Sequence, residues 1–491
     1  MGIFRKNKDA MVMGDPIPLY HEGKFHIFYL TSPVGTTVWP DRICTTWQHA
    51  VTDDLIHWEE LPPALEPGVG CKIDKDGCWT GSAIVADGKF HIFYTAADLD
   101  CENQQKICHA YSEDGITFIK DGDKPVIVPD GETYELVDWR DPYVFYNEED
   151  GCYWILIAGR KNSGPDTRRG VVALYKSEDL LVWKHWGILC DPGYTNVMEC
   201  PEMYRFAGKW YLSHSRFSES AQTIYRVSDT PYGPWRYPQH NGIGGRRFYA
   251  AKSVANDQGR RFYFGWVHDR DENKDEKNWL WGGDFCIPRE IEALPDGELR
   301  FKMPEEIYRL FGNEQPLRFM EKYGNITKVN NCIKVDSLEK MAYGFFDIDC
   351  REFLFECDVH MIDVADRAGI LIKANDDISK GYLLALDRGN QRVSLTKYPV
   401  PMDPYWADAS VAVKDFSNVE PDGPCVAEKA FALDNDSSIN VKVVIDGSIM
   451  EIFVDNSVTF SFRCCEEAEH EIGLLVQDGI VMFENIQIKM T

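Results

Sequence analysis

The chain has 491 residues, of which 44% are hydrophobic and 27% charged; these values are ordinary for a soluble globular protein, but the chain is too long for one folded core. Its formal net charge of −27 repels phosphate backbones and anionic lipid headgroups, so we expect binding to neither nucleic acids nor membranes. No apolar run reaches transmembrane length, and the amino terminus lacks the apolar segment of a signal peptide. The 15 Cys show neither a CxxC pair nor a metal-ligand spacing, which predicts free thiols, no metal site and a cytoplasmic protein.

The first 300 residues contain a repeated strand. The sequence Gly-Lys-Phe-His-Ile-Phe-Tyr occurs at residues 23–29 and again at 88–94, and weaker copies begin at Gly151, Gly208 and Gly259. Each copy opens with a turn glycine and continues as an alternating, aromatic strand. A second strand-like element, such as residues 49–53 or 109–114, follows most copies. Five units of about four strands each predict a five-bladed β-propeller.

The repeat stops near residue 310, and a different strand pattern follows. Strand-like runs occur at residues 353–357, 369–372, 382–386 and 441–445. Asp446-Gly447 joins the last of these runs to another at 449–454, and Asp-Gly between alternating strands is a strong hairpin signal. Many short strands with regular turns predict a β-sandwich. The expected fold class is all-β, with a five-bladed β-propeller at residues 1–310 and a C-terminal β-sandwich at residues 325–491.

Three carboxylates lie at nearly the same place in three of the repeated units. Asp15 and Asp141 each precede a proline, and Glu199 precedes Cys-Pro, nine or ten residues before the aromatic strand of its unit. The first strand of a propeller blade lines the central channel, so equivalent positions meet at one end of it. The repeat alone therefore predicts that the three acids surround one cavity. As an alternative, each Asp-Pro caps a turn, but independent turns have no reason to share a phase.

Three acids in one cavity suit the hydrolysis of a glycosidic bond. Carboxylates that lie close together raise one another's pKa, so one of them tends to hold a proton near neutral pH. A glycosidase uses one ionised carboxylate at the anomeric carbon and a protonated one that donates to the leaving oxygen. These side chains supply the acid, the base and the nucleophile, so no cofactor is implied.

At these residues the sequence resembles glycoside hydrolase family 32, the invertase, levanase and inulinase family. Residues 47–58, Trp-Gln-His-Ala-Val-Thr-Asp-Asp-Leu-Ile-His-Trp, look like that family's Trp-Gly-His-Ala…Asp-Leu…His-Trp block. Further elements similar to the family's are Trp79-Thr80-Gly81-Ser82, Trp139-Arg140-Asp141-Pro142, Glu199-Cys200-Pro201, Phe248-Tyr249-Ala250-Ala251-Lys252, Pro288-Arg289-Glu290 and Ile449-Met450-Glu451-Ile452-Phe453. Their joint order and spacing carry the resemblance, which runs along most of the chain.

The resemblance implies a retaining β-fructofuranosidase that acts on sucrose, fructo-oligosaccharides or fructans. Asp15 would be the nucleophile, Glu199 the general acid/base, and Asp141 the residue that stabilises the transition state through sugar hydroxyls, with the two reacting carboxyls ~5–5.5 Å apart. The expected partner is a small carbohydrate, and a homo-oligomer is compatible with the sequence. The candidate substrate-binding residues are Arg140, Trp47, Trp79, Ser82, Tyr249, Lys252 and Trp281. Each of these three Trp is equally well explained as a core residue.

The segment around the expected nucleophile departs from the family pattern. Gly14-Asp15-Pro16-Ile17 stands where the family has Asn-Asp-Pro-Asn, so two amide side chains near the sugar are missing. Two alternatives are therefore kept. An inverting furanosidase of the related five-bladed family 43 would use Asp15 as the base for a water molecule, and the anomer formed first would reveal it. A non-catalytic sugar-binding propeller would bind furanosides without turnover, although a binding module has no need of three acids.

Overall fold

The computed structural model describes residues 4–6, 12–218, 220–400, 425–433 and 438–491. The chain forms two compact units, one of residues up to 271 with 279–300, the other of residues 272–278 with those from 301 onward. The domain boundaries expected from the sequence, 1–310 and 325–491, stay a prediction. The described helices are three 3-10 turns (Asp41–Ile43, Asp166–Arg168 and Asp271–Asn273) and the single-turn helix α1 (Glu305–Tyr308). None of these described helices is long and apolar enough to cross a membrane.

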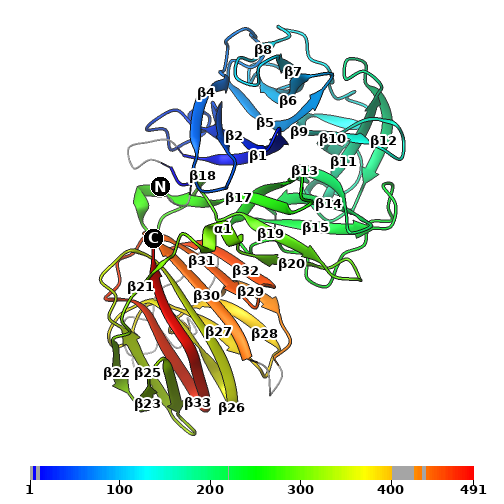
Figure 1. Ribbon diagram of the computed structural model, residues 1–491. Helices are drawn as coiled ribbons and strands as arrows, with labels where there is room; N and C mark the ends of the chain where they lie inside the picture. Colours follow the sequence, from blue (N-terminus) through cyan, green and yellow to red (C-terminus); the bar gives the residue numbers. More distant parts are fainter. Residues whose placement is uncertain (1–3, 7–11, 219, 401–424, 434–437) are drawn as a thin grey trace, which may run out of the picture. The chain divides into compact units, whose positions relative to one another are not determined.

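Five antiparallel sheets make up the first unit, in the order of the five repeats (Figure 1). Blade one contains β1 (Gly14–His21), β2 (Lys24–Thr31), β3 (Thr46–Thr52) and β4 (Glu59–Leu65). Blade two contains β5 (Gly77–Ala86), β6 (Lys89–Ala97), β7 (Gln105–Ser112) and β8 (Ile119–Lys120), and blade three β9 (Tyr134–Asn147), β10 (Cys152–Lys161), β11 (Gly170–Ser177) and β12 (Lys184–Cys190). Blade four contains β13 (Glu199–Phe206), β14 (Lys209–Arg216) and β15 (Gln222–Ser228). Blade five contains β16 (Phe248–Ala255), β17 (Arg261–Arg270), β18 (Trp279–Phe285), β19 (Arg289–Ala293) and β20 (Leu299–Lys302).

The innermost strands of the five blades form a closed ring. β1 neighbours β5, which neighbours β9, and the series continues through β13 to β16, which returns to β1. Two backbone hydrogen bonds also tie the first blade to the last: Met13 N–H donates to Gly283 O at 2.8 Å, and Gly283 N–H donates to Met13 O at 2.9 Å. The five-bladed β-propeller predicted from the repeats is therefore confirmed.

The glycine that opens each repeat has a backbone reason to be there. Each turn glycine before the aromatic strand has a positive φ, a conformation that residues with a Cβ adopt only at a cost. The five are Gly23 (82°), Gly88 (75°), Gly151 (67°), Gly208 (81°) and Gly259 (77°). Each joins the inner strand of its blade to the second strand, and the aromatic side chains of that second strand then pack between blades. The repeat seen in the sequence is thus the inner hairpin of every blade.

Blade four differs from the expected four strands. In the described residues its fourth strand is reduced to isolated bridges, Val227 with Arg236 and Ile224 with Gly242. This segment carries three prolines, Pro231, Pro234 and Pro238. Proline has no backbone N–H to donate to a sheet ladder, so a continuous outer strand is not formed here.

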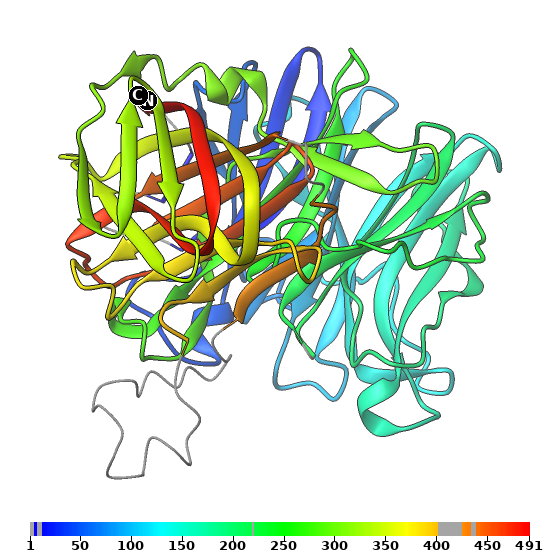
Figure 2. The same ribbon diagram turned by 90° about the horizontal axis from the view of Figure 1, so that it is seen from below.

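The second unit is a β-sandwich-like sheet in which two long strands, β26 (Glu352–Ala374) and β33 (His470–Met490), take part along their whole length. One half of β26 pairs with β27 and the other half with β30, so each long strand continues from one layer into the next. The remaining strands are β21 (Asn313–Glu314), β22 (Phe319–Tyr323), β23 (Asn325–Val329), β24 (Cys332–Asp336), β25 (Met341–Phe346), β27 (Tyr382–Asp387), β28 (Arg392–Lys397), β29 (Cys425–Ala430), β30 (Ser438–Asp446), β31 (Ile449–Val454) and β32 (Val458–Arg463). They can be followed by colour, from yellow-green to red, in Figures 1 and 2.

The hairpin predicted at Asp446-Gly447 is confirmed. β30 and β31 are antiparallel, with Asp446 opposite Ile449, and Gly447 has a φ of 58°. The runs expected at 353–357, 369–372 and 382–386 lie in β26 and β27. The β-sandwich expected for the carboxyl-terminal part is therefore present.

Candidate active site

The inner strands begin with an irregularity that recurs from blade to blade. The register of β1 shifts between Gly14 and Ile17, and that of β9 between Arg140 and Tyr143. The register of β13 shifts between Glu199 and Glu202, and that of β16 between Tyr249 and Lys252. Within these bulges the backbone enters the left-handed region. The residues with positive φ are Asp15 (34°), Asp141 (59°), Cys200 (48°) and Ala250 (47°). Bulges of this kind re-aim side chains, and strain of this kind gathers at functional sites.

The strand pairing places the three acids more accurately than their spacing in the sequence does. Asp15 and Asp141 are equivalent to Cys200, because each follows the last regular pair and precedes a proline. Glu199 lies one position earlier and is equivalent to Arg140 in blade three. The acids of blades one and three therefore occupy the bulge itself, whereas the acid of blade four occupies the position before it. The three carboxylates therefore reach the same pocket from two different positions along their strands.

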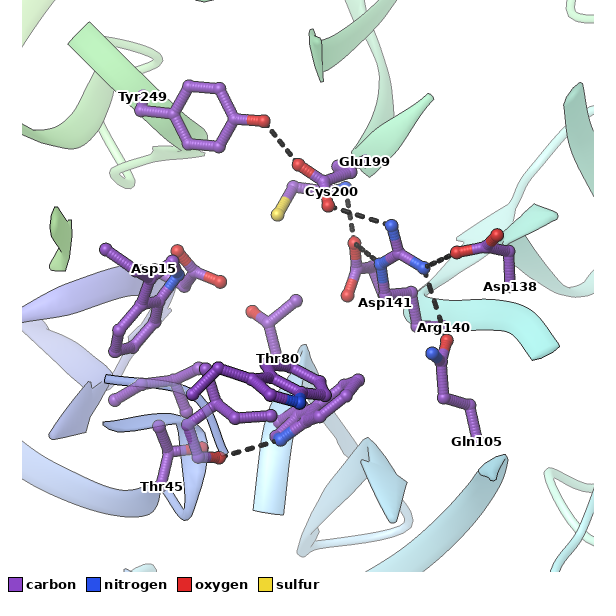
Figure 3. Close-up of a pocket in the computed structure, with 15 residues that line it drawn as sticks. Asp15, Thr45, Thr80, Gln105, Asp138, Arg140, Asp141, Glu199, Cys200 and Tyr249 are labelled. Carbon is purple, nitrogen blue, oxygen red and sulfur yellow. Dashed lines mark hydrogen bonds and ion pairs between the residues drawn. The ribbon is translucent and has the colours of Figure 1, made fainter. Parts of the chain in front are cut away.

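The bulged ends of the strands surround a pocket of about 310 Å³ in the first unit (Figure 3). All three predicted catalytic acids line it, together with four of the seven candidate substrate-binding residues. The lining residues are Asp15, Leu30, Trp39, Ile43, Thr45, Trp79, Thr80, Gln105, Asp138, Arg140, Asp141, Glu199, Cys200, Tyr249 and Trp281. The geometric condition that three acids from three blades face one cavity is met.

Three candidate residues do not line this pocket. Trp47 is 0% exposed, and its indole Nε1 donates to Trp79 O at 3.0 Å, so it supports the pocket from behind. Ser82 and Lys252 line a second cavity of about 230 Å³ in the same unit. They lie on the same inner strands beyond the bulges, where side chains meet a different part of the channel. Ser82 Oγ accepts from Val144 N–H at 2.8 Å, and Lys252 Nζ donates to Gly81 O.

Asp15 is buried at the wall formed by blades one and five. Its Oδ1 accepts a hydrogen bond of 2.9 Å from the indole Nε1 of Trp266. Burial, followed by the charges of Asp141 and Glu199, raises the pKa of Asp15 to about 7, and the opposing effects of Trp266 and Lys252 are smaller. Asp15 is therefore a carboxyl whose proton can leave near neutral pH.

Glu199 is held by two donors. Arg140 Nη2 donates to Glu199 Oε1 at 2.9 Å, and the hydroxyl of Tyr249 donates to Oε2. Burial and the neighbouring Glu199 carboxylate raise the pKa of Tyr249 well above its usual value, so the phenol keeps the proton that it donates. Burial disfavours the charge of Arg140, but Glu199, Asp141 and Asp138 outweigh burial and raise its pKa. The guanidinium stays charged and fixes the orientation of Glu199.

Asp141 is anchored by the backbone of the neighbouring blade. Its Oδ2 accepts from Cys200 N–H at 2.9 Å, and its own N–H donates to Thr95 Oγ1 at 2.9 Å. Burial raises the pKa of Asp141, Arg140 opposes this, and Glu199 adds to it. The bulge of blade four thus orients the acid of blade three.

Gly14, where the family has Asn, leaves room for an indole ring. A Cβ at Gly14 would lie 2.7 Å from Cη2 and Cζ2 of Trp281. Trp281 packs edge-on to Trp266 at 5.9 Å, and its carbonyl accepts from Arg42 Nε at 2.7 Å. The wall beside Asp15 is therefore aromatic, where an amide side chain would be polar.

Sequence reasoning missed several pocket residues. Thr80 and Cys200 lie within the family-like motifs but were not predicted as pocket residues. Asp138, three residues before Asp141, was not predicted either. Trp39, Ile43 and Thr45 come from the connection between β2 and β3, and Gln105 begins β7. No motif or repeat marks these four, because blade packing alone brings them to the pocket. Within the described residues, no group of three or more His, Cys, Asp or Glu could hold a metal ion.

A family model and two relatives of known description match the sequence of this chain. The model of the glycosyl hydrolases family 32 N-terminal domain matches residues 8–302. A rice (Oryza sativa subsp. indica) protein described as beta-fructofuranosidase, insoluble isoenzyme 2, is 30% identical over 341 residues, which is 61% of this chain and 55% of the relative. The match thus spans about half the length of that relative. The sucrose-6-phosphate hydrolase of Zymomonas mobilis is 25% identical over 475 residues, 91% of this chain and 82% of that protein.

A solved structure extends the likeness to the whole chain. Fructan 1-exohydrolase IIa from Cichorium intybus superposes with a TM-score of 0.73 at 19% identity, covering 100% of this chain and 97% of that one. At this identity the likeness concerns the fold, which is a propeller and sandwich of the same kind.

Proposed function

The chain belongs to glycosyl hydrolases family 32, and on that premise we propose that it is a retaining β-fructofuranosidase. Its substrates would be sucrose, fructo-oligosaccharides or fructans, as the names and titles of similar proteins suggest. The observation that supports this most is the pocket lined by Asp15, Asp141 and Glu199. A binding module gains nothing from gathering three acids around one pocket, two of them at strained positions, whereas glycoside hydrolysis needs such acids.

In the first step Asp15 attacks the anomeric carbon of the fructosyl unit. The bond from that carbon to the leaving oxygen breaks, and Glu199 gives its proton to this oxygen. In the second step a water molecule loses a proton to Glu199 and attacks the same carbon, which releases Asp15. Asp141 accepts hydrogen bonds from sugar hydroxyls, and the Cys200 N–H holds it in place.

Ionising all three acids at once is unfavourable, because the pocket lining has too few positive charges to balance them. Arg140 is the one cationic side chain among the residues that line the pocket. When substrate is bound, the mechanism requires an ionised Asp15 and a protonated Glu199, so one of the two hydrogen bonds that Glu199 accepts in the free pocket must be replaced by its bond to the leaving oxygen. Asp15 must lose its proton to attack, so the rate should rise as pH passes the Asp15 pKa of about 7 in the free enzyme.

Two substitutions test the assignment. Asp15→Asn and Glu199→Gln should each lower kcat/KM for sucrose by about 10³-fold or more. Glu199→Gln should spare the first step of an aryl β-fructofuranoside, because a phenolate leaves without protonation. A burst of phenol followed by slow turnover, measured by absorbance, is the expected signature. Full sucrose activity in either variant would refute the roles.

The stereochemistry of the product separates this proposal from an inverting furanosidase. Proton NMR of the first-formed fructose should show the β-anomer, before mutarotation mixes the two forms. The α-anomer would instead assign Asp15 as the base for a water molecule. Binding without turnover across sucrose, levan, inulin and aryl furanosides would support a sugar-binding propeller.

A reducing, cytoplasmic location is part of the proposal. All 15 cysteines lie in the described residues, and each is a free thiol. Free thiols in this number suit a compartment that keeps them reduced. Fractionation of source cells, with the activity followed in each fraction, tests the location; activity confined to the culture medium or cell wall would contradict it. Binding to neither nucleic acids nor membranes stays an expectation, and so does a homo-oligomeric state.

A further inference from the structure

Two polar side chains share one corner of the active-site pocket. Gln105 Oε1 and Asp138 Oδ1 both accept hydrogen bonds from Nη1 of Arg140, at 3.2 and 2.6 Å. Both residues line the pocket, and Figure 3 shows them beyond Arg140, on the side away from Asp15. We call them the Gln105–Asp138 pair. The mechanism above uses neither of them.

The amide of Gln105 has one fixed orientation. Its oxygen accepts from Trp139 N–H at 3.0 Å as well as from Arg140, so the oxygen and nitrogen can be told apart by their donors. The amide nitrogen then lies on the side that faces the pocket (Figure 3). Among the described residues, the protein gives this nitrogen no hydrogen-bond partner. A preoriented NH₂ group is thus offered to a ligand.

Asp138 is equally well fixed. Beside its bond to Arg140, its Oδ2 lies 3.4 Å from Arg160 Nε, and its side chain is 29% exposed. A carboxylate has lone pairs left after two such contacts. The pair therefore presents one donor and one acceptor next to each other. Neighbouring hydroxyls of a sugar ring match this arrangement, since each hydroxyl both donates and accepts.

The position of the pair indicates which sugar it meets. Arg140 contacts Glu199 through Nη2 and the pair through Nη1, so one guanidinium separates them. In the proposed mechanism Glu199 protonates the oxygen of the leaving group. The leaving sugar therefore lies beside Glu199, within reach of the pair, while the fructosyl unit lies at Asp15.

The charge of the pocket limits the leaving group further. Its lining holds four carboxylates, Asp15, Asp138, Asp141 and Glu199, against the single guanidinium of Arg140. A phosphate on the leaving sugar would be repelled by these carboxylates. The one cation in the lining, Arg140, is already paired with three of them.

We propose that Gln105 and Asp138 bind the hydroxyls of the leaving sugar, and that this sugar is neutral. The inference rests on the proposed function, because it takes its orientation from the role of Glu199. It assigns the substrate class as fructosides whose leaving group is an unphosphorylated, hydroxyl-bearing sugar.

Gln105→Glu tests the role of the Gln105 amide NH₂ group as a donor to the leaving sugar. The change keeps an oxygen for Trp139 N–H and Arg140 and replaces the NH₂ group by a second acceptor. The KM for sucrose should rise by ~5–10-fold with little change in kcat, while kcat and KM for p-nitrophenyl β-fructofuranoside stay within about twofold. Gln104→Glu adds the same charge at the adjacent residue, outside the pocket lining, and should leave both substrates unaffected.

Asp138→Asn tests the acceptor with the opposite change in charge, and it should also raise KM for sucrose selectively. Thermal melting shows whether each variant is folded. In the wild type, kcat/KM should be at least ~10-fold higher for sucrose than for sucrose 6-phosphate. If both variants change the two fructosides equally or not at all, or if the phosphorylated sugar is preferred, the inference is wrong. If the wild type cleaves neither sucrose nor the aryl fructoside, the proposed function itself fails, and this inference fails with it.

Discussion

The inner strands of the propeller line two cavities of opposite character. The first lies where the strands begin, in the bulges, and four of its lining residues are carboxylates against one Arg. The second lies further along the same strands and is lined by Lys252 and Arg261 with several hydroxyls and no carboxylate. A few residues of strand separate them. Two of the three pocket acids, Asp15 and Asp141, occupy the irregular, left-handed backbone, whereas the regular ladder carries groups that hold the blades together.

The two cavities are electrically coupled through Lys252. This side chain is 1% exposed and lines the second cavity, yet its charge lowers the pKa of both Asp15 and Asp141. The side chain of Lys252 thus acts on Asp15 and Asp141 from the side of the second cavity. Four substitutions test this difference between the two cavities.

Asp141→Asn should lower kcat/KM for sucrose by about 10²–10³-fold, since the carboxylate is aimed at developing charge and at sugar hydroxyls. Ser82→Ala removes a hydroxyl from the other cavity and should change kcat/KM by less than about twofold. Steady-state kinetics on both variants checks the contrast. Equal losses of kcat/KM in the two variants would show that the second cavity is as important for turnover as the pocket that holds Asp141.

Gly14→Ala should lower kcat/KM by about 10-fold, because the added Cβ would lie 2.7 Å from the Trp281 ring and displace it from the pocket wall. A second change, Trp281→Phe, makes room again. The double variant should recover part of the activity, so that the two effects are not additive. Strict additivity in kcat/KM would show that the indole position does not depend on Gly14.

Lys252→Met should shift the acidic limb of the pH profile of kcat/KM to higher pH. In the proposed mechanism Asp15 must be ionised to attack, and its pKa is about 7 with Lys252 present. Removing the positive charge raises that pKa further, so the rate falls at neutral pH and recovers in mild alkali. The pH dependence of kcat/KM for the aryl fructoside measures this. An unmoved limb would remove Lys252 from the electrostatics of the site.

Asp15→Asn should stabilise the fold above neutral pH. The folded Asp15 holds its proton up to a pKa of about 7, against the ordinary value of 3.8, so wild-type stability falls as pH rises between these values. Asn has no proton to lose, and the gain should grow over that window to ~1–4 kcal/mol. Melting temperatures at pH 4 and pH 8 measure the difference. No difference between the two pH values would contradict the raised pKa.

Much of the site could be predicted from one chain because a propeller repeats. Gly23 and Gly88 open nearly identical strands, and the similar spacing from Asp15, Asp141 and Glu199 to the turn glycines of their units places three acids at one end of the channel. The repeat does not indicate on which side of the bulge a motif residue lies. Ser82 and Lys252 stand in the same motifs but follow the bulge, so they line the other cavity, and Trp47 lies wholly buried behind Trp79.

The number of blades, the sandwich hairpin and the three acids that line the pocket could be predicted from the amino-acid sequence. Each depends on local chemistry, a turn glycine or a strand pattern, that recurs at readable intervals. The offset between Asp15 and Glu199, the indole over Gly14 and the shared bonding of Gln105 and Asp138 to Arg140 follow only from the folded structure. These depend on how the ring closes and where each strand bulges. Such contacts join residues far apart in the chain, for which no local pattern exists.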